Sequence, residues 1–449
     1  MSATAQQPVA KIGYFMDNAP QKHFLNPALT PIRGYFSYPV IGNFNVDVNS
    51  NLAVNNFMSF ASMSEMTEAE FLSGFDNLNF INNNLRIGLL GAGLHFGPAF
   101  VSFDLGTRFT TEIKAPKDLF RFIKSGIDED ASSIDYDLSN LNLSTEVMGE
   151  AALGTSVEVI KGLRVGAKAK LLLGGAKISA GMEKLKLDIN NDVVSIQSKG
   201  NLNMYAAALD FDYDNDTIVG FLLNENPAQI AGMGMAFDLG ASYSVISSDL
   251  LTVNVSAGIL DLGSMKWNKD HSSVAKAQSS FTMTREDFES MESLEEAEEA
   301  EANFQDQLMK MTKFVKQGGD NDIVERLTPT INAGVEVGTL KNKISLGLMY
   351  SQRFDPLIPT SEFTTMLNFN PISMLSVSAS YALKKAEVPA IGVTQQLPTF
   401  GLGVGLNLLV ANIFVACDYV PIDYVNAAAN THIQAGVSIA LGKRKDKKN

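Results

Sequence analysis

Apolar and polar side chains alternate strictly along many segments of this chain, with the period of a β-strand that has two different faces. In residues 400–408 every even-numbered position is large and apolar, and every odd-numbered position is glycine or asparagine. Residues 375–381 set apolar side chains against serines in the same way. The same alternation recurs in residues 101–109, 163–171, 232–240, 251–259, 331–338 and 433–439. The pattern predicts an all-β protein.

The length of these segments favours a membrane barrel over a soluble β-protein, although a soluble antiparallel sheet also has one apolar and one wet face. Soluble strands typically have about 5–6 residues, whereas a strand that crosses a bilayer on a tilt needs about 9–11, and the alternating segments here are near the longer length. Short connections alternate with longer loops, as in barrels with tight periplasmic turns and large outer loops. The short ones fall at residues 95–98, 160–162, 247–249, 340–343, 370–373 and 409–412.

Counted in this way, the chain forms a 14-stranded antiparallel transmembrane β-barrel. The crossings are expected to start near residues 40, 84, 98, 146, 163, 230, 250, 328, 342, 361, 373, 398, 411 and 430. Residues 175–229 also contain strand-like runs, which we interpret as an outer extension of two neighbouring strands; if they cross the membrane, the count becomes 16. Either number is even, so the first and last strands can pair antiparallel and close the sheet.

The barrel is expected to occupy residues 38–442, with other kinds of segment before, within and after it. Residues 1–5 resemble the end of a signal peptide, with an ordinary disordered start as the alternative. Residues 263–327 form a long outer loop, and a capping box at Thr284 followed by many glutamates predicts a helical insertion over 283–316. Residues 116–125 predict a shorter helix on the barrel rim or the lipid interface, and residues 443–449 a basic periplasmic tail.

Residues 6–37 lack alternation and carry several prolines, which remove donors from a β-ladder and argue against a central strand. Three interpretations are open: a hatch or plug inside the lumen, a periplasmic arm, or a disordered lead. The aromatic and apolar content of the segment argues against disorder.

Composition narrows the function classes. The net charge of −14 argues against nucleic acid as a partner. Only 19% of residues are charged, fewer than the roughly 25% of ordinary soluble proteins. The single cysteine excludes an intrachain disulfide, and the four histidines do not have metal-ligand spacing, so we expect no metal and no cofactor. Gly88, Gly91 and Gly93 lack the spacing of a nucleotide loop, no catalytic motif appears, and we expect a protein that is not an enzyme.

Charged residues nevertheless occupy the face that should point into the lumen. They are Arg86, Asp104, Arg108, Glu150, Lys168, Lys170, Asp238 and Glu336. A polar lumen is expected to carry charges, which either pair with one another or with the plug and fill the interior, or belong to a path for a solute.

The N-terminal motifs carry a resemblance. Residues 14–20 (YFMDNAP), then Asn26-Pro27-Ala28-Leu29-Thr30-Pro31, then Tyr38-Pro39, resemble the N-terminal signature of a Bacteroidetes family of outer-membrane barrels of unknown function. That family is similar in turn to the long-chain fatty acid transporter (FadL-like) family, whose members have an Asn-Pro-Ala motif in an N-terminal hatch and fourteen strands. The resemblance implies that Asn26, Pro27 and Ala28 lie in a plug. It covers roughly residues 10–45, and it implies no fatty-acid site, since no matching residue set is present.

Two hypotheses follow for a protein of the bacterial outer membrane that contacts the lipid bilayer. The first is a gated passive channel for a small hydrophobic solute, with residues 6–37 as the gate. The second is a non-transporting barrel that anchors an outer-membrane secretion or assembly complex and meets a protein partner at its outer loops.

Overall fold

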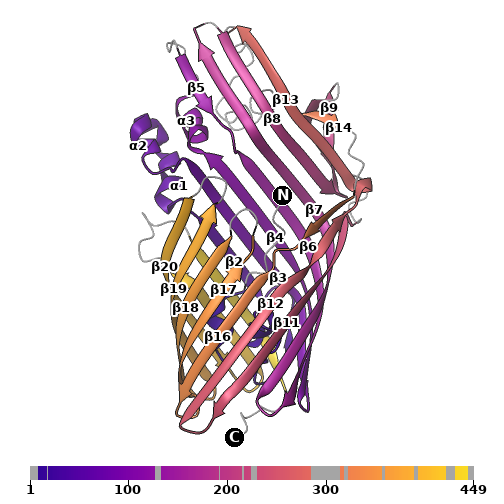
Figure 1. The fold of residues 1–449 in the computed structure, drawn as a ribbon, viewed down its shortest axis with the longest axis vertical. Coiled ribbons are helices and arrows are strands. Elements are labelled where there is room, and N and C mark those ends of the chain that lie inside the picture. The colour runs from indigo at the N-terminus through magenta and orange to yellow at the C-terminus, as the bar shows by residue number, and fades with distance from the viewer. Residues whose placement is uncertain are drawn as a thin grey trace.

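The chain forms one closed antiparallel β-barrel with a sheet that rises beyond one rim (Figure 1). The computed structural model describes residues 9–17, 19–126, 133–191, 193–214, 217–223, 230–284, 314–317, 322–355, 359–388, 393–420 and 430–442. The segment predicted to be a helical insertion, the basic tail and residues 1–8 lie wholly or mainly outside these residues.

Within the described residues the wall has fourteen crossings, and each crossing pairs with the next in sequence around the ring. The last crossing pairs with the first, so the ladder has no open edge. The crossings are β1 (Gly34–Ser37) with β2 (Phe44–Ser50), β3 (Leu78–Phe96), β4 (Ala99–Pro116), β6 (Asn142–Ile160), β7 (Leu163–Asn190), β11 (Gly232–Ser247), β12 (Leu251–Trp267), β16 (Thr330–Thr339), β17 (Ile344–Arg353), β18 (Thr360–Ile372), β19 (Leu375–Val388), β20 (Val393–Asn407), β21 (Ala411–Val420) and β22 (Thr431–Leu441). The predicted count of fourteen crossings is confirmed, and the alternative of sixteen is not.

The outer face of the barrel is an apolar band, because the alternation seen in the sequence places one side chain of every two on that face. On β11, Met233, Met235, Phe237 and Leu239 are each about half exposed, while Ala236 and Asp238 between them are buried. Every crossing from β3 onward contributes at least one exposed large apolar residue. Exposing a continuous apolar surface of this size to water would be strongly unfavourable for a monomer, whereas contact with lipid tails is favourable. Among the described residues, no helix is long and apolar enough to cross a membrane.

The first crossing is broken in its middle. Residues 38–43 leave the ladder between β1 and β2, with Val40 at φ 65° and the side chains of Val40 and Ile41 exposed. Eight residues of this crossing, from Ser37 to Phe44, span what β22 covers with four, from Ser438 to Ala435. β1 itself pairs with β22 and β3, so residues 34–37 belong to the wall and not to the hatch, which was expected to run to residue 37.

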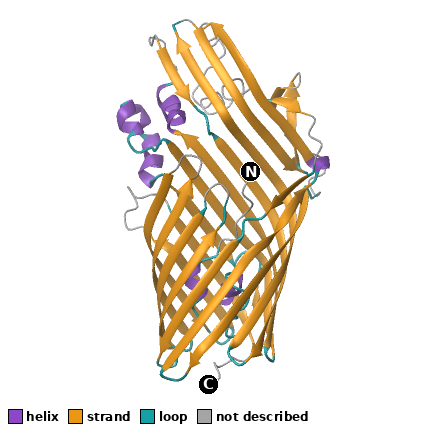
Figure 2. Ribbon diagram, in the orientation of Figure 1, coloured by secondary structure: helices purple, strands orange, loops and turns teal. Residues whose placement is uncertain are grey.

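Residues 9–33, described except for residue 18, lie inside the barrel and are called the plug from here on. Figure 2 shows helical turns within the lumen; the plug contains the 3-10 helices η1 (Lys11–Tyr14) and η2 (Pro20–Phe24). Its side chains contact the wall on several sides: Ile12 and Met16 pack with Phe414 of β21, while Phe15 packs with Met349 of β17.

The strands of residues 175–223 do not cross the membrane. β7 has 28 residues and continues past the rim, where it pairs with β8 (Val193–Ala206) and β5 (Ser133–Asp137). β13 (Ser272–Thr284), β14 (Val315–Gln317), β10 (Thr217–Leu223) and β9 (Leu209–Asp214) extend this sheet, and β15 (Ile323–Arg326) pairs with β12. The interpretation of this region as an outer extension agrees with these pairings (Figure 1).

Helices gather at the same rim as the extension. The elements are α1 (Val54–Ala61), η3 (Met63–Glu65), α2 (Glu68–Leu72) and α3 (Lys117–Ser125), with η4 (Lys269–His271) near β13. α3 was predicted within one residue, but its apolar side chains do not face lipid: Phe120 stacks on Phe75, and Phe122 meets Tyr136 of β5. α1 and α2 were not predicted.

The apolar band makes a depth-dependent prediction. Leu348→Arg, in the middle of β17 on the outer face, should destabilise the barrel in lipid vesicles by about 2–4 kcal/mol, because the cation would enter the hydrocarbon. Leu409→Arg, in the short turn between β20 and β21, should cost about 0–1 kcal/mol. Both values come from denaturant unfolding in the same vesicles. Equal costs for the two variants would show that the band does not face lipid.

Candidate functional site

The plug is held against the wall at Asn26, the first residue of the Asn-Pro-Ala motif. Its side-chain NH2 donates to the carbonyls of Ala257 at 3.0 Å and Ala241 at 3.3 Å, and to Tyr14 Oη at 3.3 Å. Its oxygen accepts the backbone N–H of Ala28 at 2.9 Å, which closes a turn around Pro27. Asn26 is fully buried. The resemblance implied that Asn26, Pro27 and Ala28 lie in a plug. In the structure these three residues form a turn of the plug that lies against β11 and β12.

The wall makes room for this motif with glycines. A Cβ at Gly240 would overlap Asn26 Oδ1, and a Cβ at Gly166 would overlap the backbone of Pro27. The two glycines are cross-strand partners on β11 and β7. The plug therefore lies closer to this part of the wall than any side chain there would permit.

His23 connects the plug to the wall through Asp104. His23 Nε2 lies 3.2 Å from Asp104 Oδ2 and 3.1 Å from Tyr35 Oη, and Tyr35 Oη donates to Asp104 Oδ1 at 3.2 Å. Lys168 Nζ reaches the same carboxylate at 3.2 Å. The ring of Phe24 lies under Lys168 Nζ, 4.0 Å away, and under the Arg86 guanidinium, 4.5 Å away, as a cation–π contact.

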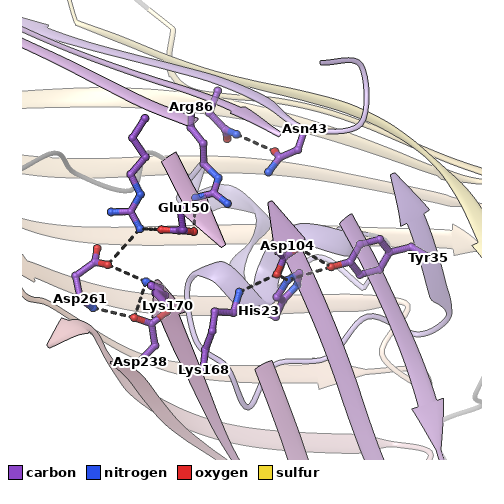
Figure 3. Close-up of polar contacts among 12 residues, drawn as sticks. His23, Tyr35, Asn43, Arg86, Asp104, Glu150, Lys168, Lys170, Asp238 and Asp261 are labelled. Atoms are coloured by element: carbon purple, nitrogen blue, oxygen red, sulfur yellow. Dashed lines mark hydrogen bonds and ion pairs between the residues drawn. The ribbon is translucent and has the colours of Figure 1, made fainter. Parts of the chain in front are cut away.

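Next to His23, charges from six neighbouring strands form one buried group, the charged network (Figure 3). Its members are Arg86, Arg108, Lys168 and Lys170 with Asp104, Glu150, Asp238 and Asp261, and each is at most 4% exposed. Glu150 accepts from Arg86 at 2.9 Å and from Arg108. Lys170 lies between Asp238 at 2.6 Å and Asp261 at 2.8 Å. Four cations face four anions, so the network neutralises itself in a place where unpaired charge would be very costly.

Seven of the eight charges predicted for the lumen belong to this network. Glu336 does not: it lies on β16 and accepts from Ser345 at 2.7 Å and Asn254 at 3.1 Å. Alternation did not predict Asp261, because an odd-numbered residue of β12 should point outward. A bulge at Leu260 and Asp261 opposite Asp238 shifts the register, Asp261 takes φ 57°, and its N–H donates to Asp238 at 2.8 Å.

His23 of the plug and Tyr35 of the short wall strand β1 were also missed, because neither the plug nor the four residues of β1 carry a readable alternation. Asp418 and Glu362 could have been found, since alternation on β21 and β18 turns both inward. Asp418 accepts the backbone N–H groups of Lys11 at 2.6 Å and Ile12 at 2.9 Å, and Glu362 pairs with Lys11 Nζ at 2.6 Å. In the described part of the chain, no three His, Cys, Asp or Glu side chains gather as a metal site.

Comparison with family models matches residues 27–418, well over half of the chain, to a family of unknown function, DUF5723. The chain belongs to the DUF5723 family. This confirms the predicted membership in a barrel family of unknown function. The Bacteroidetes origin stays a prediction. A search of curated proteins gives no match for this DUF5723 chain.

Solved structures similar to this DUF5723 chain include two described as toluene transporters and one described as a FadL homologue. The toluene transporter TodX of Pseudomonas putida is 8% identical over 99% of this chain and 100% of its own, with a TM-score of 0.47. The toluene transporter TbuX of Ralstonia pickettii is 10% identical over 96% and 97%, with a TM-score of 0.45. A FadL homologue of Pseudomonas aeruginosa is 10% identical over 98% of both chains, with a TM-score of 0.40.

The charged network predicts an asymmetry between two buried carboxylates. Glu150→Gln removes an anion shared by two buried guanidinium groups and should destabilise the barrel by about 3–5 kcal/mol. Glu336→Gln is the matched control: its hydrogen-bond partners are neutral, and the expected cost is about 1 kcal/mol. Unfolding in guanidinium chloride measures both. A cost for Glu150→Gln no larger than that of the control would contradict mutual neutralisation as the basis of the network.

Proposed function

We propose that this chain is a channel of the bacterial outer membrane, and that the plug holds it closed. The observation that carries the proposal is the way in which the plug is attached. It lies in the lumen as a separate segment, joined to the wall by side-chain hydrogen bonds and ion pairs rather than by a β-ladder. Such contacts can be exchanged for water one at a time, so a barrel can keep its ladder while its plug moves.

The hydrophobic solute expected from the sequence stays a prediction. The names of the similar toluene transporters agree with it, but much of the inward face of this barrel is polar, with asparagines, serines and charges buried along the lumen beside apolar side chains such as Met349 and Phe414. A hydrocarbon gains little from the polar part of this lining, which favours a solute with polar groups.

Removal of the plug tests the channel directly. Deletion of residues 6–33, which spares the wall strand β1, should give a barrel with a large steady conductance in planar bilayers, while the full chain stays mostly closed. The barrel must still shift on heating in gel electrophoresis, which reports the folded wall. Unchanged conductance in such a folded barrel would refute the plug as the barrier.

Two point variants test the attachment. Asn26→Ala removes two hydrogen bonds from the plug to the wall, worth about 0.5–1.5 kcal/mol each, and should raise the open fraction about tenfold. Gly240→Ala should do the same, because its Cβ would displace Asn26. The matched controls are Asn368→Ala, whose partners Ser345 and Ser378 are both in the wall, and Gly149→Ala, where the nearest atom would be 3.7 Å away. Equal conductance in variants and controls would count against the motif as the anchor.

A second candidate function is a non-transporting subunit of an outer-membrane assembly, with a protein partner at the outer side. The sheet of β5, β7, β8 and β13 beyond the rim favours it, since a channel needs no such extension (Figure 1). Purification of the full chain from native membranes in mild detergent should then recover one partner in fixed proportion. Recovery of the barrel alone would refute this candidate.

A further inference from the structure

A second polar region lies away from the charged network, between the plug and the outer ends of the opposite strands. It is a small hollow with a cavity volume of about 40 Å³. Val9 and Lys11 of the plug line it, together with Asp47, Asn49, Asn82, Asn84, Arg353, Asp355, Thr360, Lys384, Tyr419 and His432 of the wall. β3 and β17, which supply some of these residues, are seven places apart in the ring of fourteen, so the hollow extends across the lumen.

Most of the charges around this hollow are paired within the protein. Lys11 pairs with Glu362 at 2.6 Å, Arg353 with Asp355 at 2.6 Å, and His432 Nδ1 with Asp418 at 3.0 Å. Tyr419 Oη donates to Glu362 at 2.7 Å. The charges of these groups are paired with one another, so they need no ligand to remain neutral.

Asp47 and Lys384 differ from this lining. They are 7% and 6% exposed, and neither has an ion pair with the other or with any described residue. Lys384 Nζ lies 4.6 Å from the ring centre of Tyr419, which gives it a cation–π contact. One buried carboxylate and one buried ammonium group thus border the same hollow without an ion pair at contact distance. Asp47 and Glu362 attract Lys384 only from farther away, so a ligand that contacts both Asp47 and Lys384 would improve the charge pairing there.

Two more polar atoms border the hollow without a hydrogen bond to the described residues. They are Nε2 of His432, whose Nδ1 is taken by Asp418, and Oδ1 of Asn49. Both side chains are more than nine-tenths buried. Buried polar atoms are nearly always satisfied, so unsatisfied ones at a cavity wall indicate a place where a ligand or water completes the hydrogen bonds.

We propose that this hollow binds a small zwitterion, with its ammonium group at Asp47 and its carboxylate at Lys384. A lone anion would satisfy only Lys384, a lone cation would satisfy only Asp47, and each would add net charge to a poorly hydrated site. A molecule that carries both charges pairs both residues and leaves the total unchanged. The inference rests on the proposed function in naming the class of solute that the channel would hold, but binding can be measured whether or not the plug moves.

Calorimetric titration of the full chain in detergent with glycine tests the inference. Glycine should bind saturably, with a Kd of about 1 mM or below, and at least about tenfold more tightly than acetate or methylamine, each of which carries one of its charges. This comparison uses the unaltered protein and depends on no variant. Acetate or methylamine binding as tightly as glycine, or no saturable binding of glycine, would overturn the proposal.

Two variants locate the site. Asp47→Asn and Lys384→Gln should each weaken glycine binding by at least about tenfold, because each removes one ion pair with the ligand. Lys385→Gln is the matched control, since Lys385 follows on the same strand and alternation turns it to the other face. Glycine binding that survives both substitutions would refute this location. If glycine fails to bind while plug deletion still opens the barrel, only the zwitterion inference falls; if glycine binds and plug deletion changes nothing, only the channel falls.

Discussion

The structure depends on one constraint: in a closed ladder of tilted strands, each side chain must face either lipid or the lumen. The outer half of the residues therefore has to be apolar, and the inner half has to be compatible with a lumen that holds the plug. Most of the charges inside are therefore paired with opposite charges. The four cations and four anions beside His23 pair in this way, and the plug is positioned where His23 and Phe24 can join them.

The same constraint explains why so much of the wall could be predicted from the sequence. Alternation marks each crossing, and the loss of alternation at short intervals marks the turns, as at Gly97 and Gly162, which both take positive φ. The exposed Met233 and Phe237 and the buried Asp238 follow from period two alone. Extended strands beyond the rim were also predictable, because β7 keeps its strand character well past the length that a bilayer requires.

The remaining features depend on contacts between segments far apart in the chain, which no local pattern encodes. Asp261 points inward because of a single extra residue in β12, and this residue reverses the expected facing of the residues that follow it in the strand. The position of His23 is set by Asp104, 81 residues away. The start of the wall at Gly34 was missed because β1 is only four residues long and is followed by the break at residues 38–43.

The sequence nevertheless contained one indication of where the plug contacts the wall, namely the glycines that alternate with large apolar residues. Gly166, Gly240 and Gly258 are neighbours across β7, β11 and β12, and all three face the Asn-Pro-Ala motif. Glycine weakens a strand, since it packs nothing and costs chain entropy, so side-by-side inward glycines need a compensating contact. The plug supplies that contact when it is seated. These positions carry no side chain into the lumen, so in the channel proposed above the same glycines that receive the plug would also leave space along the path once the plug has moved.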